Sequence, residues 1–259
     1  MATSCIVSDS AWLMPPEHPS LDANAIHVWL ASLNQNPSLV GRFQDTLSID
    51  ERLRANQFYF RRDRERFVVS RGVLRVILGR YLDKAPETLA FNYSFYGKPF
   101  LVSETGVEEI GFNISHSFGT ALFAVTNRRE IGVDLELVRE GLEIEQIAER
   151  YFSRRENLAL CALPAELRKR AFFNCWTRKE AYIKARGEGL SLPLNKFDVS
   201  LSPGELPALL GTQPYSDEAL RWSIGELTLA SGHVAAFAVE GQAGSLCCWK
   251  WAGLSPSEI

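Results

Sequence analysis

The chain runs twice through one order of elements, and this repeat constrains its fold more than any other feature. In each half, a long stretch with helical periodicity precedes apolar segments with strand character. The similar strings TALFAVT and HVAAFAVE close the two halves, and their phenylalanines, Phe123 and Phe237, are 237 − 123 = 114 residues apart. We therefore predict an α+β fold made of two packed α/β halves, residues 1–129 and 130–259.

Hydrophobic periodicity also predicts the individual elements. Residues 49–82 are expected to form one or two helices, and residues 143–186 are expected to be mostly helical, with breaks near Ser153 and at Pro164. The segment 112–127 is expected to form one strand that a turn at 127–130 joins to a second strand at 130–138. Further strands are expected at 25–33, 197–201, 221–229, 233–240 and 246–251.

Charge and cysteine content narrow the class of protein. The 259 residues carry a net charge of −3, so nothing in the overall charge attracts nucleic acid or an anionic membrane. The five cysteines are odd in number and lack C-x-x-C spacing, which disfavours a disulfide framework or a zinc site and fits a reducing cytosol. We read no leader peptide and no membrane-spanning run, so we expect a cytoplasmic protein with neither nucleic acid nor membrane as partner.

Glu180 lies on the aromatic side of a predicted helix. At about 100° per residue, Trp176 and Lys184 lie only about 40° to either side of it. One alternative is an ordinary exposed Glu–Lys pair at i, i+4, since most such pairs are on the surface. Because an apolar face disfavours a lone carboxylate, the alternative we examine is that Glu180 has a cation, a metal or a chemical role.

Two more carboxylates occur on a neighbouring predicted strand. Asp134 and Glu136 in IGVDLE are at i and i+2 and so project from one strand face. By themselves they could form the solvated face of an amphipathic strand. Together with Glu180 they make three hard oxygen ligands, which suit Mg²⁺ and phosphate chemistry, with Mn²⁺ as an alternative ion.

A phosphate ligand would also need donors. Seven arginines fall between Arg61 and Arg80, and most are expected on a solvated helix face, with one or two turned inward. Ser115 and His116 begin a predicted buried strand and could serve either a turn or a phosphate. Lys98 falls in the turn-like YGKP and could simply be exposed.

The order and spacing of FYGKP, FNISHS, IGVDLE and WTRKEAYIKARGEGLSLP resemble the Sfp-type 4′-phosphopantetheinyl transferases. The resemblance runs from about Arg54 to Leu201, and GVDLE with WTRKEAYIK is its most specific part. It implies a pseudo-twofold pair of α/β halves with coenzyme A in the cleft between them. It also implies a Mg²⁺-dependent transfer of phosphopantetheine from coenzyme A to a serine of an acyl, aryl or peptidyl carrier protein, releasing 3′,5′-ADP. Such carriers serve fatty-acid, polyketide or nonribosomal-peptide synthesis.

The resemblance assigns expected roles to particular residues. The following positions match the family's motifs: Asp134, Glu136 and Glu180 as metal ligands in the C-terminal half, Lys184 on the pyrophosphate, Lys98 and Pro99 against the adenine, and Ser115 and His116 near the 3′-phosphate. Glu180 could also deprotonate the carrier serine, directly or through water. Ligand and base roles compete for the same oxygens, and both stay open.

One part of the pattern departs from the family. Where Sfp-like members often carry lysines before the long helix, this chain has Glu51, and Arg54 is the nearer candidate for the 3′-phosphate. Arg66 is our preferred inward-facing arginine, and the 114-residue offset aligns it with Glu180. Because one chain of this length supplies both halves, a monomer is expected.

Three other functions compete with this interpretation. A metal-dependent nuclease would need ligands for a second metal, and the chain has only four histidines. A carrier-binding module that has lost the chemistry would not need Asp134, Glu180 and Lys184 together. An RNA-binding protein would be expected to show a strongly basic balance and stacking aromatics on the arginine run.

Overall fold

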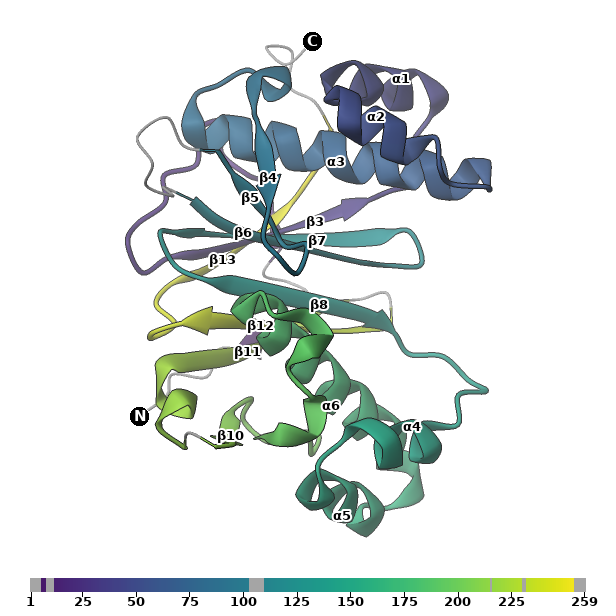
Figure 1. The fold of residues 1–259 in the computed structure, drawn as a ribbon, viewed down its shortest axis with the longest axis vertical. Coiled ribbons are helices and arrows are strands. Elements are labelled where there is room, and N and C mark those ends of the chain that lie inside the picture. Colours follow the sequence, from purple (N-terminus) through teal and green to yellow (C-terminus); the bar gives the residue numbers. More distant parts are fainter. Residues whose placement is uncertain (1–5, 8–11, 103–109, 215, 230–231, 254–259) are drawn as a thin grey trace.

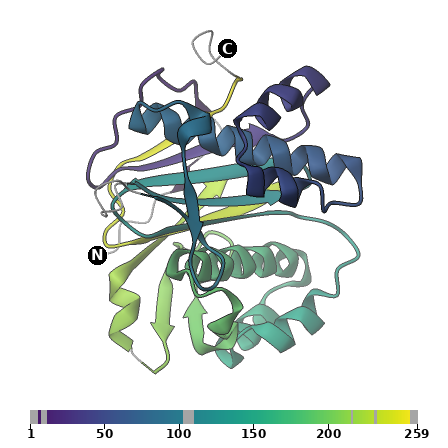
Figure 2. The ribbon, with the colours of Figure 1, turned by 45° about the horizontal axis from the view of Figure 1, so that its top comes forward.

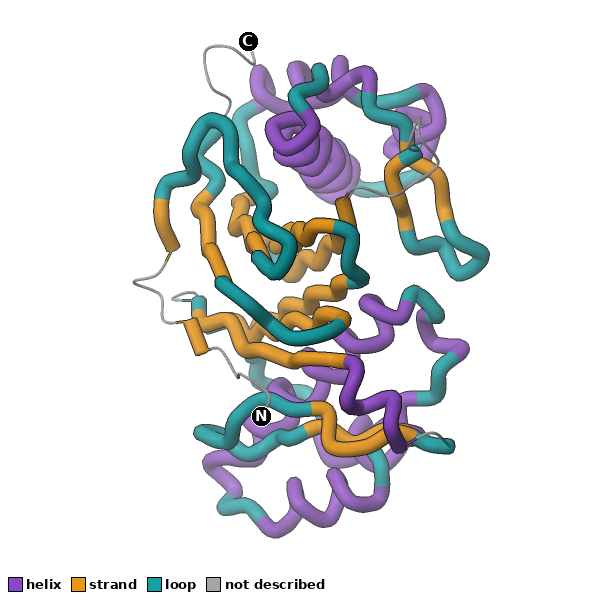
Figure 3. Tube along the Cα trace, turned by 90° about the vertical axis from the view of Figure 1, so that its left-hand side faces the viewer, coloured by secondary structure: helices purple, strands orange, loops and turns teal. Residues whose placement is uncertain are grey.

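The chain folds into two central sheets with a layer of helices outside each (Figure 1). The computed structural model describes residues 6–7, 12–102, 110–214, 216–229 and 232–253. Seen from the side, strands fill the middle and helices lie at both ends (Figure 3). The expected α+β class is confirmed.

The first helix layer covers a five-stranded sheet. Its helices are α1 (Pro37–Thr46), α2 (Ile49–Ala55) and α3 (Arg61–Leu82). The sheet has the order β2-β13-β3-β7-β6, from β2 (Trp12–Leu13), β13 (Leu246–Lys250), β3 (Ile26–Ser32), β7 (Thr120–Asn127) and β6 (Ile110–Ser117). A small hairpin of β4 (Phe91–Tyr93) and β5 (Pro99–Leu101) extends from this half toward α6 of the other (Figure 2).

The second helix layer covers a four-stranded sheet. Its helices are α4 (Ile144–Tyr151), α5 (Arg154–Ala162) and α6 (Ala165–Arg186). The sheet has the order β1-β11-β12-β8, from β1 (Ile6–Val7), β11 (Trp222–Thr228), β12 (His233–Glu240) and β8 (Ile131–Leu137). The strands β9 (Phe197–Val199) and β10 (Leu209–Thr212) pair separately.

Three apolar cores hold the layers together. One lies between α3 and its sheet, and one lies between α6 and its sheet. The third lies between the two sheets and includes Val28, Leu122, Val133 and Phe237. Because the sheets share this core, the two halves pack face to face as the sequence repeat predicts, and α3 and α6 each have 22 residues.

The ends of the chain cross between the halves. β1 pairs in parallel with β11 of the C-terminal sheet, and β13 pairs in parallel with β3 of the N-terminal sheet. The boundary that we propose between residues 129 and 130 falls in the turn between β7 and β8. Each half therefore receives one strand from the opposite end of the sequence.

One predicted strand is in fact two. The segment 112–127 was expected to be continuous, but it turns at Phe118 and Gly119, between β6 and β7. Both turn residues have positive φ, 50° and 90°, as a two-residue hairpin turn with the favoured twist requires. Because phenylalanine is an unusual residue at such a position, this hairpin is hard to predict from the residue types alone. None of the described helices is long and apolar enough to cross a membrane.

Candidate functional site

Strand β8 directs two carboxylates away from the core between the sheets. Ile131, Val133 and Leu135 are buried on its inner face. The alternate residues Asp134 and Glu136 therefore project to the other side, as the spacing predicts. Asp134 is only 4% exposed, whereas Glu136 is half-buried.

Helix α6 presents Trp176, Glu180 and Lys184 to the same place. These three side chains line one pocket with Asp134 and Glu136. The remainder of its wall comes from β6, which contributes Ile114, Ser115 and His116. The pocket measures about 360 Å³ and contains six of the ten candidate residues from the sequence: Ser115, His116, Asp134, Glu136, Glu180 and Lys184.

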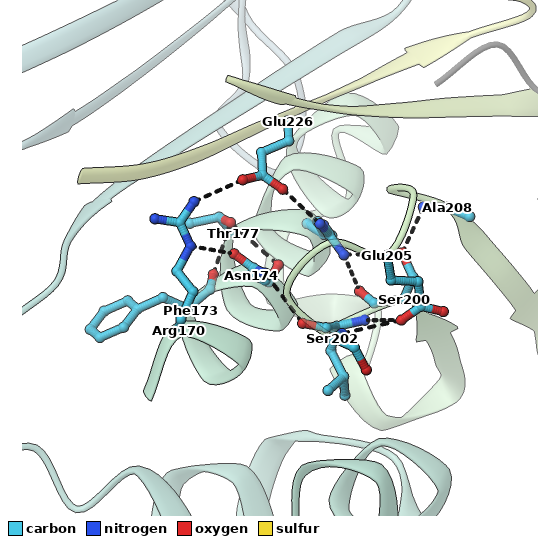
Figure 4. Close-up of polar contacts among 11 residues, drawn as sticks. Arg170, Phe173, Asn174, Thr177, Ser200, Ser202, Glu205, Ala208 and Glu226 are labelled. Carbon is cyan, nitrogen blue, oxygen red and sulfur yellow. Dashed lines mark hydrogen bonds and ion pairs between the residues drawn. The ribbon is translucent and has the colours of Figure 1, made fainter. Parts of the chain in front are cut away.

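The opposite side of α6 is fixed by buried ion pairs. Lys179 Nζ lies 2.8 Å from Glu156 Oε2, and both side chains are almost completely buried. Arg178 Nη2 lies 2.9 Å from Glu226 Oε2, next to the contact of Glu226 with Arg170 at 2.8 Å (Figure 4). Within WTRKE, the terminal residues Trp176 and Glu180 face the pocket. Arg178 and Lys179 between them are anchored in the core, and these ion pairs set the rotation of the helix about its axis.

Negative charge exceeds positive charge in this pocket. Lys184 Nζ lies 2.5 Å from Asp134 Oδ1 and 3.1 Å from Ser115 Oγ. Burial, followed by the charge of Asp134, raises the pKa of Glu180 to about 7. The same two causes raise the pKa of Glu136. One ammonium group therefore does not balance the three carboxylates, and a further cation would stabilise their ionised forms.

The carboxylates fit a divalent metal by chemistry. In the described part of the chain, no three His, Cys, Asp or Glu side chains already form a cluster that could hold a metal ion. However, Asp134 Oδ2 is buried and has no hydrogen-bond partner among the described residues. An unpartnered buried carboxylate oxygen beside two further carboxylates is a donor set that suits Mg²⁺.

Lys98 and Pro99 line a second pocket, of about 420 Å³. Lys98 Nζ lies 2.5 Å from Glu130 Oε2 and donates to the carbonyl oxygen of Ala185 at 2.9 Å. Lys98 therefore ties the β4–β5 hairpin to the C-terminal half. Strand β6 and helix α6 both contribute residues to each pocket. Glu130, directly before β8, lines the second pocket and is four residues before Asp134, about 13 Å along an extended strand.

Neither candidate arginine lines these two pockets. Arg54 is exposed, with its guanidinium 5.8 Å from the ring centre of Phe67. Arg66 donates to Asn34 Oδ1 at 3.0 Å and lies against the turn at Gly119. Glu51, which stands where lysine was expected, is buried and lies 2.7 Å from Arg75 Nη2.

Arg71 is a candidate that sequence reasoning did not select. It is 8% exposed, and its Nη1 is buried with no hydrogen-bond partner in the described residues. Desolvation, followed by the charge of Lys184, lowers the pKa of His116, and the charges of Arg66 and Arg71 contribute to the same lowering. Arg71 is therefore within electrostatic reach of the pocket. Its spacing of four residues from Phe67 was the available signal, because it places Arg71 on the inward face.

Comparison with known proteins identifies two matching family models and several relatives. A family model described as the 4′-phosphopantetheinyl transferase superfamily matches residues 130–238, and one described as 4′-phosphopantetheinyl transferase, N-terminal, matches residues 35–127. The chain is 42% identical over 230 residues to the 4′-phosphopantetheinyl transferase HetI of Nostoc sp., covering 89% of this chain and 94% of that protein. It is 32% identical over 160 residues to Sfp of Bacillus subtilis, covering 62% of this chain and 69% of Sfp.

A third relative, the 4′-phosphopantetheinyl transferase gsp of Aneurinibacillus migulanus, is 35% identical over 136 residues, which cover 52% of this chain and 54% of that protein. The two family models together account for most of the chain, and their boundary falls between β7 and β8. The chain therefore belongs to the 4′-phosphopantetheinyl transferase family, and it is an enzyme of the class that transfers phosphopantetheine from coenzyme A to carrier proteins.

Proposed function

We propose that this enzyme converts apo acyl, aryl or peptidyl carrier proteins to their holo forms in a Mg²⁺-dependent reaction that releases 3′,5′-ADP. The observation that carries this proposal is the gathering of three carboxylates and Lys184 in one pocket between the halves. Ser115 and His116 come from one half, and Asp134 and Glu180 come from the other. Because one chain supplies both walls, the proposed enzyme acts as a monomer.

Asp134, Glu136 and Glu180 are the residues that would hold the metal, with the unpartnered Oδ2 of Asp134 as one donor. When bound, Mg²⁺ or Mn²⁺ would neutralise charge on the pyrophosphate of coenzyme A. The ammonium of Lys184, now 2.5 Å from Asp134 Oδ1, is the protein's own cation at this place. We assign it to stabilising the negative charge that develops on the pyrophosphate.

Glu180 is also placed to receive a proton. In the reaction, the carrier serine oxygen bonds to the phosphorus next to pantetheine, and the bond from that phosphorus to the 3′,5′-ADP oxygen breaks. The serine proton must leave, and the Glu180 carboxylate can accept it directly or through water. Base and ligand roles for Glu180 both fit its position.

The two pockets along β6 and α6 suit an extended ligand. We assign the adenine to the pocket at Lys98 and Pro99, and the pyrophosphate to the pocket at Asp134. Ser115 and His116 stay our proposed contacts near the 3′-phosphate. Arg54, Arg66 and Arg71 are the proposed cations for this phosphate, and of these Arg71 is the most buried.

Replacing His116 with alanine tests the phosphate assignment. The variant is expected to weaken coenzyme A binding about 10- to 150-fold, since a hydrogen bond to a charged group contributes about 1.5–3 kcal/mol. Dephospho-coenzyme A lacks the 3′-phosphate, so its binding should change little. Isothermal titration of both ligands measures the difference, and equal losses for both would assign His116 a structural role.

The segment 138–156 is our proposed docking surface for the carrier. The structure buries its apolar residues Ile144 and Phe152 in the core of the C-terminal half, so they are not available to a partner. Arg154 and Arg155 remain exposed, and Leu158, one turn further along α5, is 64% exposed. The proposed surface is therefore centred on the start of α5, with a basic rim that suits acidic carriers.

Reversing the charge of Arg154 and Arg155 to glutamate tests this surface. The two arginines occupy the first turn of α5, where the helix dipole disfavours cations, so glutamates should slightly stabilise the helix. We expect the KM for the carrier to rise about tenfold and its salt dependence to shrink, with the KM for coenzyme A unchanged. A rise in the coenzyme A constant alone would assign these arginines to the nucleotide.

One incubation tests the proposed reaction as a whole. Coenzyme A, Mg²⁺ and an apo carrier protein are combined with the enzyme, and the carrier is examined by intact mass. A gain of one phosphopantetheine group that disappears with EDTA supports the proposal. A nuclease or a carrier-binding module would leave the carrier mass unchanged. The four described cysteines form no disulfide bond with one another, which supports our proposed cytoplasmic location.

A further inference from the structure

The two sheets meet along two edge strands, β6 and β8. On the sides where they face each other, neither strand pairs with another described strand. β6 is the edge strand of the five-stranded sheet, and β8 is the edge strand of the four-stranded sheet. Each pairs with a neighbour in its own sheet, β6 with β7 and β8 with β12. An edge strand leaves every second backbone N–H group without a ladder partner, and these groups need acceptors when they are buried.

Side chains of β6 supply acceptors for the free edge of β8. Three β8 backbone N–H groups donate to alternate residues of β6, each from a residue 20 positions later in the sequence. The contacts are Val133 to Asn113 Oδ1 at 3.0 Å, Leu135 to Ser115 Oγ at 3.2 Å and Leu137 to Ser117 Oγ at 3.3 Å. We call Asn113, Ser115 and Ser117 the polar ladder. Its constant offset aligns the two strands in the same direction with a fixed register.

Each serine of the polar ladder makes a second contact. Ser115 Oγ donates to Asp134 Oδ1 at 3.0 Å. Ser117 Oγ donates to Glu136 Oε2 at 3.1 Å. Each hydroxyl thus accepts a hydrogen bond from the backbone N–H of one β8 residue. It donates one to the side-chain carboxylate of the preceding β8 residue. At the Asn113 level, the equivalent β8 residue is Gly132, which has no side chain.

The polar ladder is buried, and its hydroxyl groups are fully occupied on the donor side. The exposed fractions of Ser115 and Ser117 are 6% and 7%. A hydroxyl has one proton to donate, so the contact with the carboxylate selects its rotamer once the β8 amide has fixed the oxygen. Ser115 also accepts from Lys184, whereas Ser117 contacts no cation among the described residues and does not line the pocket of Asp134.

We propose that Ser117 is a positioning residue that aims the Glu136 carboxylate into the site. This inference rests on the proposed metal site, because it takes Glu136 as a ligand. Ser117 touches neither substrate nor metal in this proposal and acts only through Glu136. A half-buried carboxylate on an edge strand would otherwise sample several rotamers, and holding one of them lowers the cost of ligation.

The alternation of the string NISHS follows from this arrangement. Its first, third and fifth residues form the polar ladder, so His116 between the serines projects to the other side of β6 and keeps its solvent access. One strand therefore joins the two halves, orients two carboxylates and presents an imidazole. The residue types at 113, 115 and 117 are those that can accept from a backbone amide.

Binding of Mn²⁺ to the free enzyme, followed by electron paramagnetic resonance, tests the proposal without turnover. Ser117→Ala is expected to weaken Mn²⁺ binding about tenfold or more, as is usual when a ligand loses its supporting hydrogen bond. Ser117→Thr keeps the hydroxyl and should bind Mn²⁺ as the wild type does. The Mg²⁺ concentration for half-maximal activity should rise in S117A, with the lost rate recovered at high Mg²⁺.

Ser223 of β11 provides a matched control. It is 6% exposed, donates to the Gly241 carbonyl at 2.7 Å and accepts from the Ala243 amide at 3.2 Å. Within the described part of the chain, its hydroxyl contacts no carboxylate. Ser223→Ala should reduce stability to a similar degree as S117A and leave Mn²⁺ binding unchanged. Thermal unfolding of both variants establishes that they are compared as folded proteins.

Glu136→Ala, measured in the same titration, separates the two proposals. If E136A binds Mn²⁺ as tightly as the wild type, Glu136 is not a ligand and the proposed metal site is wrong. If E136A loses affinity but S117A stays within about twofold of the wild type, the positioning role of Ser117 is overturned. An equal loss of Mn²⁺ affinity in S223A and S117A overturns it as well. The same conclusion follows if S117T has the thermal stability of the wild type but binds Mn²⁺ no more tightly than S117A.

Discussion

Asp134→Ala and Glu180→Ala are each expected to abolish phosphopantetheine transfer, with a loss of about a thousandfold or more. A metal at charge-bearing oxygens contributes several kcal/mol to the transition state, and each variant removes one of its proposed ligands. Both residues line a pocket, and Asp134 Oδ2 has no hydrogen-bond partner among the described residues, so the fold should persist. Intact mass of the carrier, followed over time, measures the loss.

Glu87→Ala serves as the control for these two variants. Glu87 is an exposed carboxylate of the short 3₁₀ turn after α3, on the N-terminal half, and its removal should leave transfer unchanged. Circular dichroism should show the same helix content in all three variants. Near wild-type turnover of D134A or E180A with Mg²⁺ would contradict the assignment of that residue as a metal ligand.

Lys179→Met is expected mainly to lower stability and Lys184→Met mainly to lower turnover, although the two lysines lie on the same helix. Lys179 is 0% exposed and paired with Glu156, so K179M leaves a buried carboxylate without its cation. Breaking such a pair costs about 3–5 kcal/mol, and we expect a correspondingly lower urea midpoint. Lys184 is partly exposed in the pocket, and Asp134 keeps its hydrogen bond from Ser115 when Lys184 is removed. K184M should therefore lose much less stability than K179M but about 10²- to 10³-fold in kcat.

Urea unfolding and turnover per folded molecule distinguish these two roles. The double variant E156Q/K179M should recover part of the stability lost in K179M, because the unpaired charge is then gone. If K179M instead lost as much kcat per folded molecule as K184M, Lys179 would belong to the reaction chemistry. If K184M unfolded as easily as K179M, the contact of Lys184 with Asp134 would be structural.

The predictions of individual helices and strands rested mainly on local hydrophobic periodicity. The helix over 165–186, with Gly187 directly after it, and the strand over 131–137 follow from short-range patterns of apolar residues. The i, i+4 spacing of Glu180 and Lys184 and the i, i+2 spacing of Asp134 and Glu136 determine which side of each element carries them. Their presence in one pocket agrees with that expectation, while their chemical roles stay predictions.

Other expectations failed or were incomplete where a pattern had two physical explanations. One or two arginines of the run 61–80 were expected to turn inward, and Arg71 and Arg75 are buried in α3, whereas Arg66, our preferred residue, is only half-buried. Arg75 is held by Glu51 and by carbonyl oxygens more than ten residues away, which no helical window contains. Ile144 and Phe152 could equally have faced a partner or the core, and packing decided for the core.

Local patterns of apolar residues specify long elements such as α6 and β8 and the direction in which their side chains project, because the backbone geometry of three or four residues decides both. Which elements meet depends on long-range packing. The exchange of β1 and β13 between the sheets, the contact of Lys98 with Glu130 and the alignment of β6 beside β8 are all of this kind. They depend on the burial of apolar surface shared by distant segments, and no short stretch of sequence contains that energy.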